Sequence, residues 1–490
     1  KKSTFIICIY FFGTMLFNSF EFFVFLPTVF FFYWFVFNNN LRIQNLLLLI
    51  SSYVFYGWWD WRFLSLIFLS TIVDYFIGLK IYCCDEIKLK KKYLWVSILF
   101  NFGLLAFFKY FNFFIDSWID LISFFGYEYS SRWTLNIILP VGISFYTFQT
   151  MSYSLDIYYK NLKPTKDFIS FASFVSFFPQ LVAGPIERAS NLLPQILKPR
   201  KFRYVQGAQG IKLILWGLFK KIVIADSLSS SVDIIFLNYS IYNGGVLLLG
   251  LIYFSFQIYC DFSGYSDIAI GTSKLFGFEI MSNFKFPYFS RNIGEFWRRW
   301  HISLSTWFRD YLYIPLGGSK KGKWISIRNT FIIFITSGFW HGANLTFIFW
   351  GLTHSLLFIP SLIRGENRKY SENKKIERGC LNYITDLVRI GFTFSLITIA
   401  WVFFRSNTVL DSFHYLYYVL HGIAFPDKFR VNMIIVLIFI VLEFVMKKSE
   451  RNLFQIKNPI SRTLLYVILT FTTTLFYLHS EINSFIYFQF

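Results

Sequence analysis

The chain has 490 residues, of which 55% are hydrophobic and only 15% are charged, and its mean hydropathy is +0.50. Soluble chains usually carry about 25% charged residues, so this composition indicates a polytopic membrane protein and argues against a soluble domain. The 47 Lys and Arg residues against 27 Asp and Glu give a net charge of +20. This excess gathers in short loops, as the positive-inside rule predicts, and we expect no nucleic-acid partner.

Apolar runs near the length of a membrane span, about 20 residues, recur along the whole chain. They lack the alternating pattern of barrel strands, so we expect an all-α protein with roughly ten to twelve transmembrane helices and no separate soluble domain. The candidate spans are residues 20–37, 43–57, 62–82, 94–115, 134–155, 208–225, 244–262, 328–350, 383–404, 431–446 and 461–480.

Basic loops between these runs predict how the chain is oriented in the membrane. They lie at residues 85–92, 198–203, 320–328, 364–378 and 447–457. The positive-inside rule places all five in the cytosol. The final span would then carry the C-terminus to the extracytoplasmic side.

Three stretches fit a simple span poorly, of which residues 264–290 are polar for a span. Residues 168–187 contain Pro179 and Pro185, so we expect a broken helix that is buried in protein or lies beside a cavity. Residues 291–318 predict an amphipathic helix at the membrane interface. Its apolar face would carry Phe296, Trp300, Leu304 and Trp307, and its polar face Glu295, Arg298, Arg299 and Ser303.

His341 is the sharpest candidate for chemistry, in the nearly uncharged run Ser337-Gly-Phe-Trp-His-Gly-Ala-Asn344. Ionisable groups at membrane depth are costly and are functional candidates by default. Burial would keep this imidazole neutral, so that it could act as a general base. Asn344 lies three residues on, where a helix would place it on the same face to orient the ring or stabilise an oxyanion. From the residues alone, a structural histidine bonded to a neighbouring helix is the somewhat favoured alternative.

His301 is a second candidate, within a run from Glu295 to Gly318 that holds three Trp, three Arg and one His. The residue types alone fit an amphipathic side chain at headgroup level as well as they fit a functional role. The five cysteines show no metal-ligand spacing, so we expect no metal site.

Together the two histidine segments resemble the histidine-bearing core of the membrane-bound O-acyltransferase family, in its bacterial branch that acetylates exported polysaccharides. The segments 139–149, 179–188 and 257–267 also resemble signatures of this family. One departure is Leu345, where relatives of the alginate type often have Trp, and it puts in doubt only the fine shape of the tunnel.

The resemblance runs from Met15 to the end of the chain. It implies a single transmembrane domain over residues 15–490, with helices and re-entrant segments around a central tunnel. Residues 1–14 would be an N-terminal extension.

The resemblance also implies roles for individual residues. His341 would be the base, and His301 would line the tunnel for the acyl donor. A basic collar would hold the phosphates of coenzyme A, although positive-inside charge or lipid headgroup contact explains it equally well. The collar residues are Arg298, Arg299, Arg309, Lys320, Lys321 and Lys323.

The implied reaction moves acetyl from cytosolic acetyl-CoA across the bacterial inner membrane, with no permanently bound cofactor. A periplasmic partner, an acetyltransferase of the SGNH type, would complete O-acetylation of a glycan such as an alginate-like polysaccharide or peptidoglycan. The last residues, Phe485-Ile-Tyr-Phe-Gln-Phe490, resemble a C-terminal motif of the family in which a tyrosine relays the acyl group, here Tyr487. An aromatic interfacial anchor is the simpler reading of the same residues.

Two alternatives remain open at this level. The first is transfer of D-alanine or another acyl group by a member of the same family. The second is a multi-span transporter or flippase that uses Asp261 and Asp267 for coupling, since carboxylates near the end of a span should face a cavity or a partner.

Overall fold

The structure is a computed structural model that describes residues 15–126, 134–135, 137–182, 184–368, 370, 380–422, 424–447, 456, 458–479 and 485–486. Every regular element in these ranges is a helix or a helical turn, which confirms the predicted all-α class. The expected extension over residues 1–14 and the candidate relay Tyr487 lie outside the described residues.

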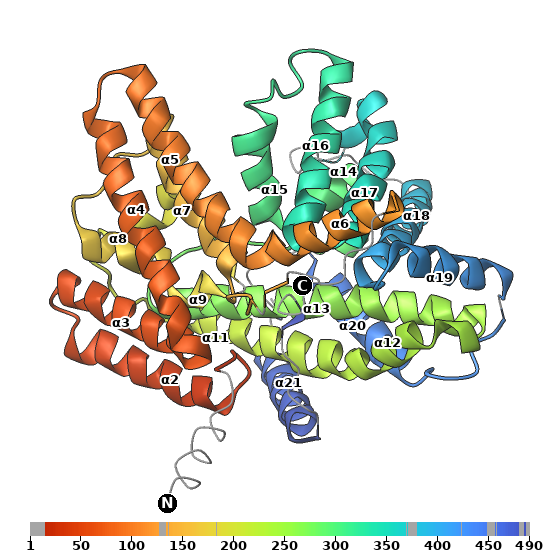
Figure 1. Ribbon diagram of the computed structural model, residues 1–490. Helices are drawn as coiled ribbons and strands as arrows, with labels where there is room; N and C mark the ends of the chain where they lie inside the picture. The colour runs from red at the N-terminus through yellow and green to blue at the C-terminus, as the bar shows by residue number, and fades with distance from the viewer. Residues whose placement is uncertain are drawn as a thin grey trace, which may run out of the picture.

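Residues 20–105, drawn in red to orange, form the left side of the molecule in Figure 1, and the next helix along the chain crosses toward the other side. Two of these helices begin at a polar N-cap residue. The Ser19 side chain accepts a hydrogen bond from the Phe22 amide, and the Asn40 side chain accepts one from the Ile43 amide. The elements are α2 (Phe20–Phe31), the π-helical turn η1 (Phe32–Val36), α3 (Leu41–Asp60), the 3-10 turn η2 (Trp61–Phe63), α4 (Leu64–Cys83), α5 (Ile87–Leu105), the π-helical turn η3 (Ala106–Tyr110) and α6 (Phe111–Phe124).

The proline-containing segment is broken, as its sequence predicts. After α7 (Ile143–Tyr158) come three short helices, α8 (Phe168–Val175), α9 (Phe178–Leu181) and α10 (Ala189–Ile196). All four residues of α9 are buried, and Pro179 stands at its start, where a missing backbone N–H costs little. Irregular backbone is tolerated within a membrane fold because protein surrounds it here.

Helix α13 (Gly244–Leu275) is the longest helix of the described chain and crosses the middle of the molecule in Figure 1. Helix α11 (Tyr204–Leu218) packs along it and continues through the π-helical segment η4 (Phe219–Asp226) into α12 (Ser227–Leu237). Between α12 and α13 lies the 3-10 turn η5 (Tyr239–Ile241).

Two glycine pairs bring the backbones of α11 and α13 into contact. A Cβ atom added at Gly271 would lie 2.5 Å from the carbonyl oxygen of Gly210, and one added at Gly264 would lie 2.8 Å from that of Gly217. Helices in a membrane associate largely through such close approach of small residues, because lipid is as apolar as a leucine side chain. This close contact also lets η4 pack against α13.

The following segment approaches α13 from the other side, in the upper part of Figure 1. It comprises the 3-10 turn η6 (Pro287–Phe289), α14 (Ile293–Trp297), α15 (Ile302–Phe308), the π-helical turn η7 (Arg309–Tyr313), α16 (Lys323–His341), α17 (Leu345–Ile363) and the 3-10 turn η8 (Glu366–Arg368).

The C-terminal helices are α18 (Cys380–Arg405), α19 (Val409–His421), α20 (Asn432–Met446) and α21 (Pro459–His479). Helix α20 exposes a row of large apolar side chains, as a surface that faces lipid should. They include Ile434, Leu437, Val441 and Phe444. Phe485 and Ile486, which follow α21 in the sequence, are buried.

Six helical stretches of the described chain are long and apolar enough to cross a membrane, fewer than the ten to twelve expected. The first, Leu41–Cys83, contains both α3 and α4 and so merges two predicted spans. Two other predicted spans form shorter helices, since α7 has 16 residues and α11 has 15. The chain is a multi-pass membrane protein in which several helices lie inside the protein.

The glycine contacts predict opposite effects for the same substitution on two helices. Gly271→Ala should destabilise the protein by about 1–3 kcal/mol, because its Cβ meets backbone that must move. Gly103→Ala on α5 should be neutral or stabilising by up to about 1 kcal/mol, because nothing lies within 4 Å of its added Cβ. Thermal unfolding in detergent measures both, and equal shifts would contradict the packing described here.

Candidate functional site

His341 is the last residue of α16, which packs against α17. The helix ends there because Gly342 takes an extended conformation, with φ −162° and ψ 154°, and α17 starts only at Leu345. The prediction of one continuous span over residues 328–350 is therefore wrong. The break places the imidazole at a helix end, where its surroundings differ from those of a residue in mid-span.

The last carbonyl groups of α16 are satisfied by side chains of η3. Lys109 Nζ donates to the carbonyl oxygens of Trp340 at 2.8 Å and His341 at 2.9 Å, and the Tyr110 hydroxyl donates to that of Phe339 at 2.8 Å. The final carbonyls of a helix lack intrahelical partners and carry partial negative charge, so an ammonium group suits them. Lys109 and Tyr110 thus fix the helix end that bears His341.

Aromatic rings surround the His341 imidazole. The ring centroids of Trp340, Trp350 and Phe404 lie 5.0, 5.1 and 5.4 Å from its own. The imidazole of His301 lies 6.3 Å away, also between centroids. The structure therefore brings together the two histidines that the sequence singled out, and both are buried.

His301 stands in the turn between α14 and α15 and has a φ of 42°. A left-handed conformation costs a non-glycine residue roughly 1–3 kcal/mol, and such strain gathers at functional sites. The prediction of an interfacial helix over residues 291–318 is wrong, because the helix is interrupted at this turn. Glu295 and Ser303 of its supposed polar face are each 1% exposed, as buried as the apolar face.

Asn283 fixes which nitrogen of His301 carries the proton. Its Oδ1 accepts from the Ser303 amide at 3.3 Å and the Ser303 hydroxyl at 2.9 Å, and lies 3.1 Å from His301 Nδ1. An amide oxygen only accepts, so Nδ1 donates to it, and a neutral imidazole then keeps its lone pair on Nε2. This Nε2 is buried without a hydrogen-bond partner among the described residues. A buried acceptor of this kind points to a ligand that donates a hydrogen bond.

Asn344 does not share a helix with His341, contrary to the expectation. Its side-chain oxygen accepts from the Thr346 amide at 3.0 Å and so caps α17, and its Nδ2 donates to the Asn407 carbonyl at 3.1 Å. Asparagine is among the preferred N-cap residues because its short side chain reaches these free amides. Asn344 therefore holds the turn that follows His341.

The expected basic collar divides into two groups, of which the first lies beside His301. Arg299 pairs with Glu295 at 2.8 Å, and Arg298 donates to the carbonyl oxygen of Asn367. Arg298 is exposed and Arg299 is partly buried. Both arginines lie within three residues of His301 in the sequence.

The second group lies toward the start of α16. Arg309 pairs with Asp310 at 2.6 Å, and Lys320 is exposed in the turn before the helix. Helix α16 separates Lys323 from His341 by about 27 Å, at 1.5 Å per residue. Lys320 could therefore reach only the remote end of a long donor bound at the histidines.

Several residues of the site were missed from the sequence. Lys109 and Tyr110 had a usable signal, because a lysine in an apolar run of spanning length is unusual and needs a partner. Asn283 had none, since it lies in a loop and its partner is 18 residues away. The described residues contain no group of three or more His, Cys, Asp or Glu that could hold a metal ion.

The fold and this pair of buried imidazoles define a multi-pass membrane protein with a polar site enclosed by its helices. The family model described as MBOAT, membrane-bound O-acyltransferase family, matches residues 104–375, a range that includes both histidines. The chain belongs to this family, and it is an acyltransferase.

Three relatives show how the chain relates to known members of the family. It is 40% identical to the probable alginate O-acetylase of Pseudomonas syringae pv. tomato, over 81% of this chain and 73% of that protein. It is 37% identical to the peptidoglycan O-acetyltransferase of Helicobacter pylori, over 81% of this chain and 78% of that protein. It is 30% identical to the teichoic acid D-alanyltransferase of Bacillus subtilis, over 56% of this chain and 70% of that protein.

Replacing the lysine that caps α16 should impair acyl transfer without a change at the histidine itself. Lys109→Met leaves two buried carbonyls without their donor, a loss of about 1–3 kcal/mol at that helix end. Lys88→Met, at an exposed position on α5, serves as the matched control and should transfer at the wild-type rate. Rates in nanodiscs measure both, and an unaffected Lys109→Met enzyme would contradict the capping role.

The tautomer of His301 predicts an order among variants of Asn283. Asn283→Leu removes the acceptor for Nδ1 and should lower the acyl-transfer rate about tenfold or more, the rate equivalent of one hydrogen bond of about 1.4 kcal/mol. Asn283→Asp keeps an accepting oxygen and should retain more activity than Asn283→Leu. The opposite order, measured on monodisperse protein, would rule out this assignment of the proton.

Proposed function

We propose that the chain is an O-acetyltransferase of the bacterial inner membrane, which takes acetyl from cytosolic acetyl-CoA for O-acetylation of an exported polysaccharide or of peptidoglycan. The observation that carries this proposal is the pair of buried imidazoles, 6.3 Å apart between centroids, within the part of the chain that matches the family. The names of the relatives at 40% and 37% identity support acetyl as the cargo and a surface glycan as the acceptor.

In the proposed reaction His341 is the general base. It takes the proton of an attacking hydroxyl, whose oxygen forms a C–O bond to the thioester carbonyl carbon. The C–S bond then breaks, and the imidazolium returns the proton to the departing thiolate. His301 Nε2 accepts a hydrogen bond from the donor, which agrees with a place in the acyl-donor tunnel. Asn344 contributes by holding the turn behind the base.

The donor would approach from the cytosolic side, given the basic loops of the sequence. Arg298 and Arg299 would contact it near the histidines, and Arg309 and Lys320 would contact only its remote phosphates. Guanidinium groups pair with phosphate in a bidentate way, which fits such a role.

The acetyl group would leave through the C-terminal segment. Tyr487 would accept it as an ester, which divides one difficult transfer across the membrane into two easier steps. A periplasmic acetyltransferase of the SGNH type would then receive it and complete acetylation of the glycan.

A second candidate is D-alanyl transfer, which the 30% identity to a teichoic acid D-alanyltransferase favours. Transport driven by Asp261 and Asp267 has less support. Asp261 lies 2.8 Å from Lys221 and Asp267 lies 2.6 Å from Lys220, and coupling would require these ion pairs to break.

The first test follows radiolabelled acetyl-CoA with purified protein in nanodiscs. His341→Ala should lower thioester consumption about 10²- to 10⁴-fold, the usual contribution of a general base. Tyr487→Phe should retain no label on the protein, and any acetyl-CoA that it still consumes should be hydrolysed by water to free acetate. His421→Ala, at an exposed position outside the site, is the matched control and should behave as wild type.

Two outcomes would overturn parts of this proposal. If wild-type protein leaves acetyl-CoA intact with its periplasmic partner present, the donor is wrong and a D-alanyl carrier protein becomes the next substrate to test. If His341→Ala consumes acetyl-CoA at the wild-type rate, His341 is not the base.

A further inference from the structure

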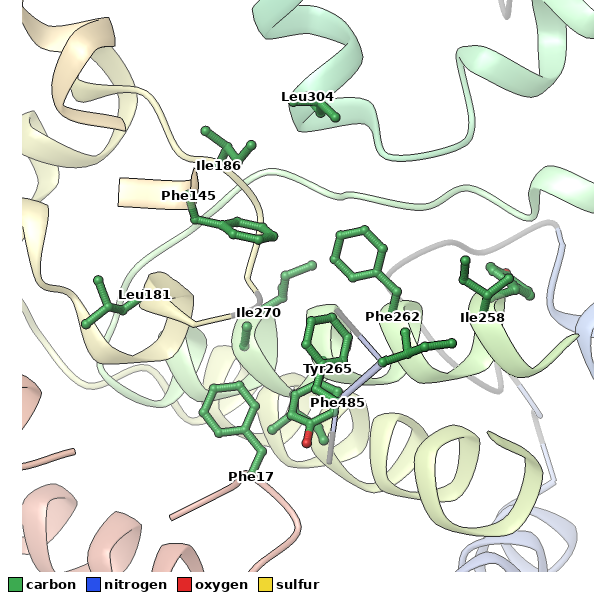
Figure 2. Packing of buried hydrophobic residues seen from close by; sticks show 14 of the residues in the cluster. Phe17, Phe145, Leu181, Ile186, Ile258, Phe262, Tyr265, Ile270, Leu304 and Phe485 are labelled. Atoms are coloured by element: carbon green, nitrogen blue, oxygen red, sulfur yellow. The ribbon is translucent and has the colours of Figure 1, made fainter. Parts of the chain in front are cut away.

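Phe485 and Ile486, the C-terminal segment, lie in the interior of the protein. Phe485 is 0% exposed, and its ring lies 4.5 Å from that of Tyr265 and 5.7 Å from that of Phe262, between centroids. Figure 2 shows this ring against α13, in the same apolar cluster as Phe17. Residues that follow a terminal helix are usually poorly ordered unless they are tied down. Something must therefore hold this segment in place.

A carboxylate of α13 supplies that attachment. The Ile486 amide donates to Asp261 Oδ2 at 2.6 Å, across 225 positions of sequence. The other oxygen of Asp261 lies 2.8 Å from Lys221 Nζ, which also lies 2.8 Å from Asp226. All three charged side chains are at most 5% exposed.

The charges of this cluster explain why it binds a backbone amide. One ammonium group faces two carboxylates, so the cluster keeps a net negative charge when all three groups are ionised. A buried carboxylate is costly unless its oxygens accept hydrogen bonds, and a peptide N–H aimed at Oδ2 meets this need. The π-helical segment η4 brings Lys221 to this place, and π-helical turns often mark functional sites.

The attached segment lies one aromatic ring away from His301. Phe262, next to Asp261 in α13, contacts both the Phe485 ring, at 5.7 Å between centroids, and the His301 imidazole, at 4.7 Å. Because Asp261 and Phe262 are neighbours on one rigid helix, their contacts fix the segment and the histidine relative to each other.

We propose that Asp261, held by Lys221, is a positioning residue that docks the C-terminal segment beside the acyl-transfer site. The proposal rests on the proposed function, because it gives the docked segment the task of meeting the acyl group. The carboxylate acts on the segment through the Ile486 amide and does not itself touch the reacting atoms.

The docking is tested by the reactivity of a cysteine at the attached position. Ile486→Cys keeps the backbone amide, and its thiol should react slowly with a maleimide, read at that peptide by mass spectrometry. Adding Asp261→Ala should raise the labelling rate about 10- to 100-fold, as loss of a hydrogen bond to a charged group predicts. Asp267→Ala is the control. Asp267 lies on α13, as Asp261 does, and its replacement breaks the ion pair with Lys220 but should leave labelling slow.

A conservative variant guards against general loosening of the fold. Asp261→Asn retains an accepting oxygen, so Ile486→Cys in this background should be labelled at an intermediate rate. The Asp261→Ala and Asp261→Asn proteins should both be monodisperse in detergent. Labelling that does not change in Asp261→Ala, or that rises equally in Asp267→Ala, would overturn the docking.

Activity then separates positioning from the chemistry at the histidines. Asp261→Ala should lower transfer of label to the periplasmic acceptor while acetyl-CoA is still consumed, with water taking the acetyl group as free acetate. An equal fall in label transfer and in acetyl-CoA consumption would show that Asp261 acts on the histidines and would overturn the positioning role. If wild-type protein consumes no donor, the proposed function fails, yet the labelling result still decides whether Asp261 docks the segment.

Discussion

The interior of this protein is governed by the lack of water at membrane depth. Every helix end and every charge there must find its partner within the chain. Lys109 and Tyr110 meet this requirement for the last turn of α16. The Asp74 carboxylate meets this requirement by accepting hydrogen bonds from the side chains of Ser97, Asn101 and Ser154, on two neighbouring helices. The polar interactions that stabilise the fold are therefore the ones that place the site.

Helix α13 connects these requirements. Its glycines allow α11 and η4 to approach closely, and that approach sets Lys221 against Asp261. On the same helix Phe262 contacts His301. A packing contact that is purely steric thus determines which charges meet, and through them where the C-terminal segment lies.

The two imidazoles come from different local structures, one from a helix end and one from a strained turn. Each is oriented by a side chain distant in sequence, since Asn283 holds His301 and Lys109 holds the helix end that bears His341. Relatives named for acetyl and for D-alanyl transfer match this chain. One fold can therefore serve different acyl groups, because the cargo depends on the site and not on the fold.

Composition and hydrophobic run lengths by themselves determined the membrane class and the helical fold, and Pro179 and Pro185 determined the break at residues 168–187. The motif around His341 and the run around His301 were enough to select both histidines. Only the tertiary structure decided that the span ends at His341 and that Glu295 and Ser303 are buried, because capping and ion pairing depend on residues brought together by the fold. For the same reason the anchoring of Ile486 by Asp261 could not be read from either segment alone.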